Sequence, residues 1–310
     1  MKRKVIQHGP SLIVSLPSKW VKKMGIIKGE ELEISEQGST LLISGNSHPA
    51  VSEVSADLTG FDRTTIMYVV SGLYRLGYDR VKLTFKNEKT VYQRKQKTMS
   101  VLDVIHEAAS RLIGFEIMQE REGYCELVEL QTPSERDFDQ VLRRIFLLLV
   151  EAHEDLLLGA KNCDEKILNT IENRHDTITK FVSYCLRLLN KNKYPEGNKI
   201  PYYFHVIASL DRITDLVKYS ARDRLNYKKP LDKRTIHILE IVSADLRLYY
   251  EIFYKYDNLK IRKINEDRYI VEKTITESNM GTIDTMISTG GRYLLEQLLD
   301  LIEARTALQY

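Results

Sequence analysis

The chain of 310 residues is 43% apolar and 29% charged, a balance that excludes a disordered or fibrous protein and leaves room for two or three domains with real cores. Its longest apolar run, Ile145 to Val150, is far too short to cross a bilayer, and no apolar segment of a signal peptide follows the basic N-terminus. The net charge is +3, but residues 1–28 hold seven basic and no acidic groups, and the other 282 residues hold 39 basic and 43 acidic groups. We therefore expect a cytoplasmic protein without membrane insertion, with a polyanionic partner at its basic head.

Residues 1–45, the head, have the pattern of a small β-rich module. Gly9-Pro10 is a turn between two short apolar segments, Pro17 opens a short helix, and Gly25 closes it. The expected elements are strands at 4–8 and 12–16, a helix at 18–24, and strands at 31–34 and 40–43. About a dozen large apolar residues cannot build a core alone, so we expect a homodimer or a higher even oligomer.

Residues 50–131 predict a small α/β unit with the order βαβαββ. Gly77 and Gly114 follow the two expected helices, and Glu122-Gly123 turns the last hairpin. The expected elements are a strand at 51–58, a helix at 62–76, a strand at 80–85, a helix at 100–112, and strands at 115–120 and 124–130. No glycine-rich phosphate loop occurs in this segment.

Residues 132–310 have a helical pattern almost throughout, beginning with the start signal Thr132-Pro133-Ser134-Glu135. Breaks occur at Gly159, Tyr194 to Gly197, Lys229-Pro230 and Met280-Gly281, and a less certain one is expected near Asn258 to Asn265. The six expected helices span 134–160, 164–192, 200–226, 231–260, 264–279 and 282–308. Such lengths and short connections predict an antiparallel bundle, so the fold class is multidomain α+β with a mainly α C-terminal part.

Two segments of the expected bundle share one order of residue types. Leu210 to Val217 and Leu295 to Ile302 both contain two acids four residues apart among apolar residues, and they lie 85 residues apart, which predicts a repeat of three helices. The acidic residues are Asp211 and Asp215, and Glu296 and Asp300; Glu172 and Asp176 repeat the spacing. Two carboxylates four residues apart on a helix repel each other by roughly a few tenths of a kcal/mol, and a cation bound by both would turn this cost into a stabilisation. The alternative is a solvated face, the commoner meaning of this spacing.

The sequence offers little for catalysis. It contains no zinc-protease histidine pair, Walker motif or nucleophile elbow, and His153-Glu154-Asp155 has the pattern of a polar helix face. The three cysteines, Cys125, Cys163 and Cys185, are widely spaced and odd in number, which predicts buried thiols in a reducing compartment. An enzyme is not expected.

Residues 2–44 resemble the swapped-hairpin domain of the AbrB and MazE type. The resemblance rests on Val5 to Ser11, Val14 to Val21, and Gly25 to Ile34. That family forms intertwined homodimers, and many members bind double-stranded DNA through basic residues, whereas others bind a protein partner. The resemblance implies DNA contacts from Lys2, Arg3, Lys4, Lys19, Lys22 and Lys23. Charge alone is equally consistent with nucleic-acid binding and with solvated lysines.

Residues 132–310 resemble the PhoU family of phosphate-signalling proteins, which consist of two three-helix repeats. That family carries an acid-x-x-x-Asp motif in each repeat, with which iron or zinc clusters are associated. Asp211/Asp215 and Glu296/Asp300 match it, although the glycine that usually precedes the final Asp is Thr214 in one repeat and Leu299 in the other. The resemblance implies iron or zinc at these carboxylates.

The combination of both modules resembles archaeal PhoU-like phosphate uptake regulators, and it supplies no role for residues 50–131. The expected function is a phosphate-responsive transcriptional regulator that binds DNA through the head and senses through the bundle. The alternative is a DNA-independent adaptor that inhibits a phosphate transporter or its signalling protein, with the head serving only to dimerise. A metal-dependent enzyme is disfavoured, because no general base or nucleophile adjoins the carboxylate pairs.

Overall fold

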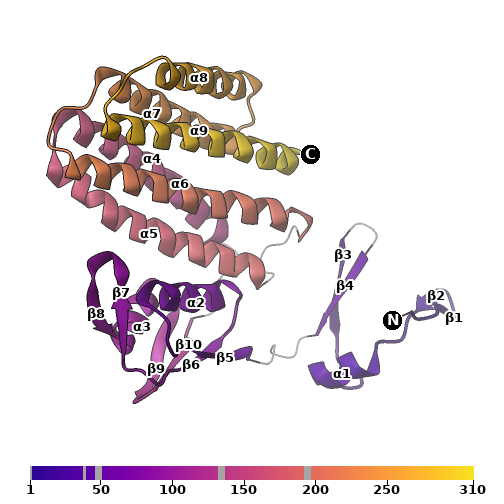
Figure 1. The fold of residues 1–310 in the computed structure, drawn as a ribbon. Coiled ribbons are helices and arrows are strands. Elements are labelled where there is room, and N and C mark those ends of the chain that lie inside the picture. Colours follow the sequence, from indigo (N-terminus) through magenta and orange to yellow (C-terminus); the bar gives the residue numbers. More distant parts are fainter. Residues whose placement is uncertain (1, 38–39, 46–50, 132–136, 192–196) are drawn as a thin grey trace. The chain divides into compact units, whose positions relative to one another are not determined.

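A computed structural model describes the chain except for residues 1, 38–39, 46–50, 132–136 and 192–196. The described residues form nine α-helices and ten β-strands, the α+β composition expected from the sequence (Figure 1). The chain divides into two compact units, residues 1–52 and 53–310. Within the described ranges, no helix combines the length and the apolarity that crossing a membrane requires.

The first unit, residues 1–52, consists of two β-hairpins and a short helix. β1 (Ile6–His8) pairs antiparallel with β2 (Ser11–Ile13), and β3 (Leu32–Gln37) pairs antiparallel with β4 (Thr40–Gly45). The two hairpins are separate two-stranded sheets. α1 (Ser18–Met24) lies between them in the chain and ends at Gly25, whose φ of +67° is a left-handed conformation that favours glycine.

The second unit begins with an α/β part, residues 53–131. Its four-stranded sheet has the order β5-β6-β10-β9, in which only β5 and β6 are parallel. The strands are β5 (Glu53–Asp57), β6 (Arg80–Thr84), β9 (Phe115–Arg121) and β10 (Tyr124–Glu129), and the helices are α2 (Arg63–Arg75) and α3 (Val101–Ala109). Alternate residues of β6, Val81 and Leu83, share a buried core with Ile66 of α2 and Val104 of α3. This core has no residue in common with that of the helices that follow.

One hairpin of the α/β part has no counterpart among the elements expected from the sequence. β7 (Lys89–Tyr92) pairs antiparallel with β8 (Lys97–Ser100) around a 3-10 turn, η1 (Gln93–Lys95). Its residues are mostly polar, so they show no apolar alternation. The hairpin is held instead by tertiary contacts, one of which is the 2.7 Å hydrogen bond from Thr90 Oγ1 to the carbonyl of Phe61.

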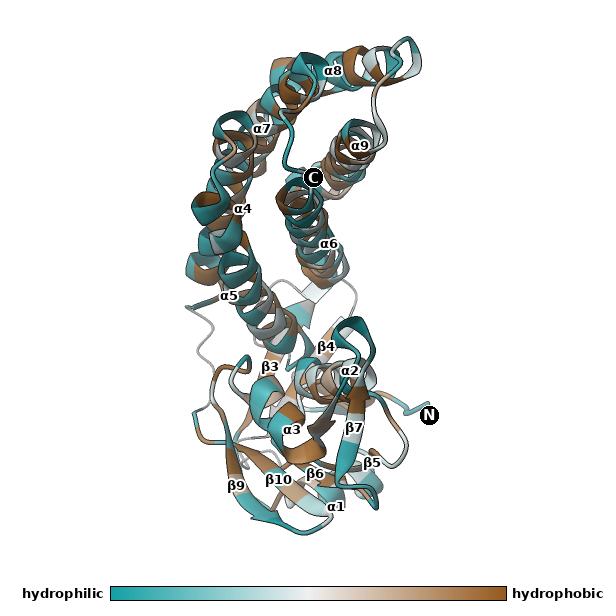
Figure 2. Cartoon of the chain, turned by 60° about the vertical axis from the view of Figure 1, so that its left-hand side comes forward, coloured by the Kyte–Doolittle hydropathy of each residue, from teal (hydrophilic) through white to brown (hydrophobic). Residues whose placement is uncertain are grey.

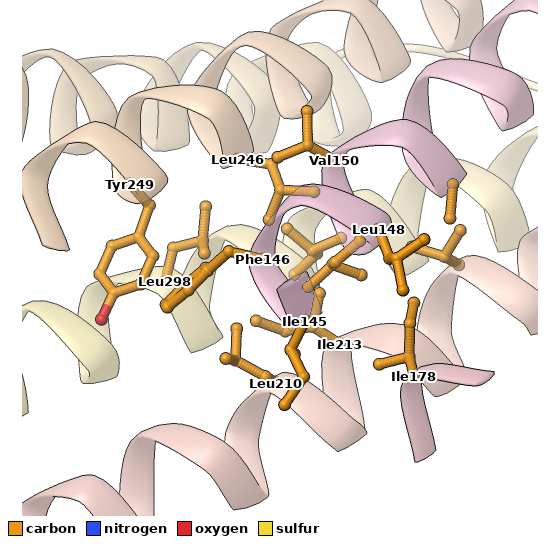
Figure 3. Close-up of a cluster of buried hydrophobic side chains, with 14 of the residues drawn as sticks. Ile145, Phe146, Leu148, Val150, Ile178, Leu210, Ile213, Leu246, Tyr249 and Leu298 are labelled. Atoms are coloured by element: carbon orange, nitrogen blue, oxygen red, sulfur yellow. The ribbon is translucent and has the colours of Figure 1, made fainter. Parts of the chain in front are cut away.

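The helical bundle forms the rest of the second unit. Its helices are α4 (Asp137–Asn162), α5 (Glu165–Asn190), α6 (Ile200–Asn226), α7 (Lys233–Tyr254), α8 (Asn258–Thr276) and α9 (Thr282–Gln309), and a 3-10 turn, η2 (Gly197–Lys199), precedes α6. Helices adjacent in sequence pack together within α4–α6 and within α7–α9, and α6 with α9 and α4 with α7 join the two groups. Each helix carries hydrophobic and hydrophilic residues (Figure 2), and the apolar ones, among them Phe146, Leu210, Leu246 and Leu298, meet in one core (Figure 3).

The structure corrects three details of the sequence analysis. The break between α7 and α8 lies at residues 255–257 rather than near 258–265, because the Asp257 carboxylate caps α8 by accepting hydrogen bonds from the backbone N–H of Leu259 and Lys260. Cys163 is exposed, because it lies in the tight connection between α4 and α5; the other two thiols are buried, as expected. His153 is not on a polar face: it is 1% exposed inside α4, and burial lowers its pKa to about 4.

Candidate functional site

Arg187 of α5 anchors the bundle to the α/β part and is fully buried. Its guanidinium donates hydrogen bonds to the carbonyl oxygens of Tyr74 (2.7 Å) and Tyr78 (2.8 Å) and, through Nη2, to Glu129 Oε1 (2.8 Å). One turn later, Lys191 Nζ donates to the other carboxylate oxygen of Glu129 at 2.6 Å. Because every charge in this network has a partner, it fixes where α5 lies against the α/β part.

Four of the acidic residues singled out from the sequence face this junction from the first group of three helices, α4–α6. They are Glu172 and Asp176 on α5, and Asp211 and Asp215 on α6. Two of them accept hydrogen bonds from arginines of the α/β part. Arg75, the last residue of α2, donates to Asp211 at 3.2 Å, and Arg111, just after α3, donates to Asp176 at 2.9 Å. The protein's own cations therefore offset part of the repulsion between these carboxylates.

The other two carboxylates are paired within the bundle. Arg222 donates to Glu172, and Lys218 donates to Asp215. His175, which the sequence analysis did not single out, also binds Asp215, with its Nε2 3.1 Å from Oδ1. Burial by itself would raise the pKa of Asp215, but the hydrogen bonds from His175 and Lys218 outweigh it and hold that pKa at about 2.

His175 connects carboxylates of α5 and α6. Its Nδ1 lies 3.0 Å from Asp176 Oδ1, and its Nε2 faces Asp215. Burial by itself would lower the pKa of His175, but the hydrogen bonds to the two carboxylates outweigh it, so the pKa is raised. The two carboxylates stabilise the imidazolium form, whereas Lys218 Nζ, 2.8 Å from Nε2, opposes it.

These pairings bear on the expected metal site. Among the residues that the structure describes, no group of three or more His, Cys, Asp and Glu side chains is arranged to hold a metal ion. In the first group of three helices the carboxylate oxygens bind arginine, lysine and histidine, which a cation would have to displace. Iron or zinc binding by these residues stays a prediction.

The acids of the second group of three helices, α7–α9, have different surroundings. Glu296, on α9, lies 3.4 Å from Arg268 of α8, and Asp300 is exposed. A second carboxylate pair in this group, which spacing did not reveal, is buried between α7 and α8. Asp245 is 0% and Asp267 is 4% exposed, and neither oxygen of Asp245 has a hydrogen-bond partner among the described residues. Burial and the neighbouring Asp267 raise the pKa of Asp245 to about 7.

A cavity of about 510 Å³ opens at the junction between the β7–β8 hairpin, the end of α3, and helices α5 and α6. We call it the junction cavity. Its lining is dominated by charged side chains: Arg63, Arg94, Lys95, Lys97, Arg111, Lys218 and Arg222, with Glu107, Glu172, Asp176 and His175; Tyr92 and Tyr219 contribute rings. An adjoining cavity of about 470 Å³ continues past Arg75, Asp211 and Asp215. Seven cationic groups against three carboxylates give the junction cavity a positive balance.

The basic candidates of the head lie in the first unit, and all of them are exposed. Lys2, Arg3 and Lys4 precede β1, and α1 carries the remaining three, Lys19, Lys22 and Lys23. Within the described residues, no ion pair involves any of the six. Their charges are therefore available to a partner from solvent.

Comparisons with known proteins add no relative to this description: no protein-family model, no curated protein and no solved structure matches the chain.

Proposed function

We propose that this protein is a homodimeric transcriptional regulator that binds double-stranded DNA through its first unit and senses phosphate status through its helical bundle. The observation that carries the proposal is the surface of the first unit, which is apolar and basic at once. Its apolar part supports assembly with a second copy, and its basic part supports a nucleic-acid partner.

The described apolar side chains of the first unit do not pack into a buried core. Among the residues between positions 2 and 45 whose exposure the structure describes, none is buried. Large side chains of both hairpins lie open, and Leu12, Ile34 and Leu41 are 70%, 61% and 62% exposed. Two-stranded sheets with such surfaces are not stable alone in water. A second copy offers the same hairpins for pairing, as in the intertwined dimers of the AbrB and MazE type that residues 2–44 resemble.

The basic part favours DNA over a protein partner. Lys2, Arg3 and Lys4 form a charged N-terminal arm, and Lys22 and Lys23 lie in the last turn of α1. A dimer doubles this charge and repeats it on two arms related by symmetry, which suits a symmetric duplex site. Phosphate contacts by lysine and arginine dominate such affinity and make it depend on salt.

The role of the bundle rests on its resemblance to the PhoU family and on its division into two groups of three helices. The described residues of the junction and of helices α7–α9 offer charged groups for sensing. An adaptor that contacts a phosphate transporter or a signalling protein without DNA is the alternative that the following experiment separates.

DNA binding is tested by fluorescence anisotropy with the duplex upstream of the protein's own gene, at 50 to 300 mM salt. The wild type should bind with a steep salt dependence. Changing Lys2, Arg3 and Lys4 together to alanine should weaken binding and reduce the slope of log K against log salt by about one unit for each DNA phosphate that the variant no longer neutralises. The matched control changes three exposed lysines of the second unit, Lys229, Lys233 and Lys273, and should bind as the wild type does. Wild-type protein without salt-sensitive affinity would favour the adaptor.

Assembly is tested separately, by light scattering on the full chain and on residues 53–310. The full chain should be a dimer or a larger even assembly, and removal of the first unit should reduce its order. A full chain that is monomeric at micromolar concentration would refute the dimer. The DNA-binding measurement would then be interpreted independently of assembly.

A further inference from the structure

We propose that the junction cavity binds a small molecule that carries phosphate groups. The inference concerns the second unit alone, so it does not depend on DNA binding by the first. Its starting point is the charge around the cavity, which the protein's own acids do not balance.

The inner cations of the cavity are held in place by carboxylates. Arg63 and Lys218 have side chains that are only 13% and 9% exposed, and they pair with Glu107 and Asp215. Arg111, 28% exposed, also donates to Glu107, at 3.1 Å. These groups are positioned before any ligand arrives, which removes much of the entropy cost of ordering them.

The outer cations lack such partners. Lys95 and Lys97 have no carboxylate partner among the described residues, and Arg94 approaches one only at 3.9 Å, through Nη1 to Glu172. These three lie on the η1 turn and at the start of β8, so a single short segment brings them to the cavity. Like charges gathered without counter-charges repel each other, and an anion bound between them would replace this repulsion by attraction.

Tyr92 helps to gather these cations on one side of the cavity. The guanidinium carbon of Arg63 lies 4.4 Å from the centre of its ring, that of Arg94 lies at 5.8 Å, and Lys95 Nζ lies at 5.7 Å. Cation–π attraction stabilises this grouping around the ring without neutralising the charge. The cations therefore remain able to bind an anion.

The chemistry of the lining suits a phosphate group. Among the described residues, no carboxylate hydrogen-bonds Arg94, Lys95 or Lys97, whereas Arg63, Arg111 and Arg222 add guanidinium groups that also bind Glu107, Asp176 or Glu172. Guanidinium and ammonium groups are common protein partners of phosphate oxygens. A volume of about 510 Å³ lies within the range of sites for small molecules and holds a ligand with one to three phosphates. A free phosphate and a phosphorylated metabolite share this chemistry, and the experiment below distinguishes them.

The position of the cavity gives binding a mechanical consequence. Arg63, Arg94 and Arg111 belong to the α/β part, whereas Lys218 and Arg222 belong to α6 of the bundle. A phosphate that contacts both sides adds hydrogen bonds across the junction. Occupancy should therefore stabilise the second unit and the docking of its two parts.

Binding is measured by isothermal titration calorimetry on the full chain in a phosphate-free buffer at constant ionic strength. The probes are inorganic phosphate, pyrophosphate, ATP without metal, and citrate as a carboxylate of similar charge. At least one phosphate probe should bind more tightly than citrate. The same probe should raise the melting temperature of the second unit, followed by far-ultraviolet circular dichroism. Whether inorganic phosphate or ATP binds more tightly identifies the source of the phosphate group.

The decisive variant changes Arg94, Lys95 and Lys97 together to alanine. All three are exposed, so the fold should persist, and the affinity should fall at least tenfold. The control changes Lys229, Lys233 and Lys273, which alters net charge equally away from the cavity, and it should bind as the wild type does. The proposal is overturned if no phosphate probe binds at millimolar concentration, if citrate binds as well as the phosphates, or if both triple variants lose affinity equally.

Discussion

Replacing Arg187 with methionine tests the account of how the bundle holds the α/β part. The change keeps much of the side-chain volume and removes the four hydrogen bonds that the guanidinium donates to Tyr74, Tyr78 and Glu129. Breaking a buried ion pair costs about 3–5 kcal/mol when the other charge is left without a partner. Glu129 keeps Lys191 at 2.6 Å, so we expect a loss at the lower end, about 3 kcal/mol in the free energy of unfolding.

Two optical signals separate the units in this experiment. The only tryptophan, Trp20, lies in the first unit, whereas most helical residues lie in the second. In urea, the midpoint of the far-ultraviolet circular dichroism transition should fall by about 1 M, since unfolding slopes reach roughly 3 kcal/mol per molar. Trp20 fluorescence should keep its midpoint.

Arg174 provides the matched control, because it lies on the same helix and its pairs with Glu151 and Asp155 are partly exposed. Its replacement by methionine should cost less than about 1 kcal/mol. Equal losses for the two arginines would refute the reasoning that the buried network anchors the junction.

Three further predictions concern the charged groups of the bundle. Asp245→Asn should stabilise the protein by roughly 2–4 kcal/mol at pH 8 and little at pH 4. Burial raises the pKa of Asp245 in the folded protein to about 7, so the wild type loses stability as pH rises from the pKa of the unfolded state to that of the folded state. Melting temperatures at both pH values check this, with Glu303→Gln at an exposed site as the control. His175→Gln should destabilise the protein most at pH 5–6 and least at pH 9. The pKa of His175 is raised in the folded protein, so the stability that its imidazolium contributes is present below the ordinary pKa of 6.5 and is lost as pH rises through the folded pKa. Urea titrations that show the same destabilisation at both pH values would contradict the pairing with two carboxylates. Changing Glu296 and Asp300 to amides should lower iron or zinc content, measured by elemental analysis after purification without chelator, and should leave the metal-free melting temperature unchanged; equal metal content would reduce this pair to a solvated face.

Local signals in the sequence were sufficient to predict the bounds of some helices. The helix expected at 200–226 is α6 with the same bounds, because Pro201 stands in its first turn and a Lys229-Pro230 break follows it. The helix at 18–24 likewise matches α1, which Pro17 precedes and Gly25 ends. In both, the residues that start and stop the helix are themselves specified by the sequence.

Tertiary partners could not be read in the same way. The spacing of the acids on α5 and α6 indicated paired carboxylates. Nothing local indicated that Arg75 would bind Asp211 across a sequence separation of 136, or that Arg111 would bind Asp176 across a separation of 65. The junction cavity was missed for the same reason, because its cations are scattered between residues 63 and 222. Asp245 was missed because a buried acid inside an amphipathic helix looks like any polar residue until its neighbours are known.

The most direct test of the proposed function is recovery of the DNA that the protein binds in cells, with and without phosphate in the medium. Cross-linking followed by sequencing should show enrichment of discrete upstream regions that differs between the two conditions. The enrichment should disappear when Lys2, Arg3 and Lys4 are alanine in a protein expressed at the same level. Wild-type enrichment no greater than that of this variant in both media would contradict a DNA-binding regulator.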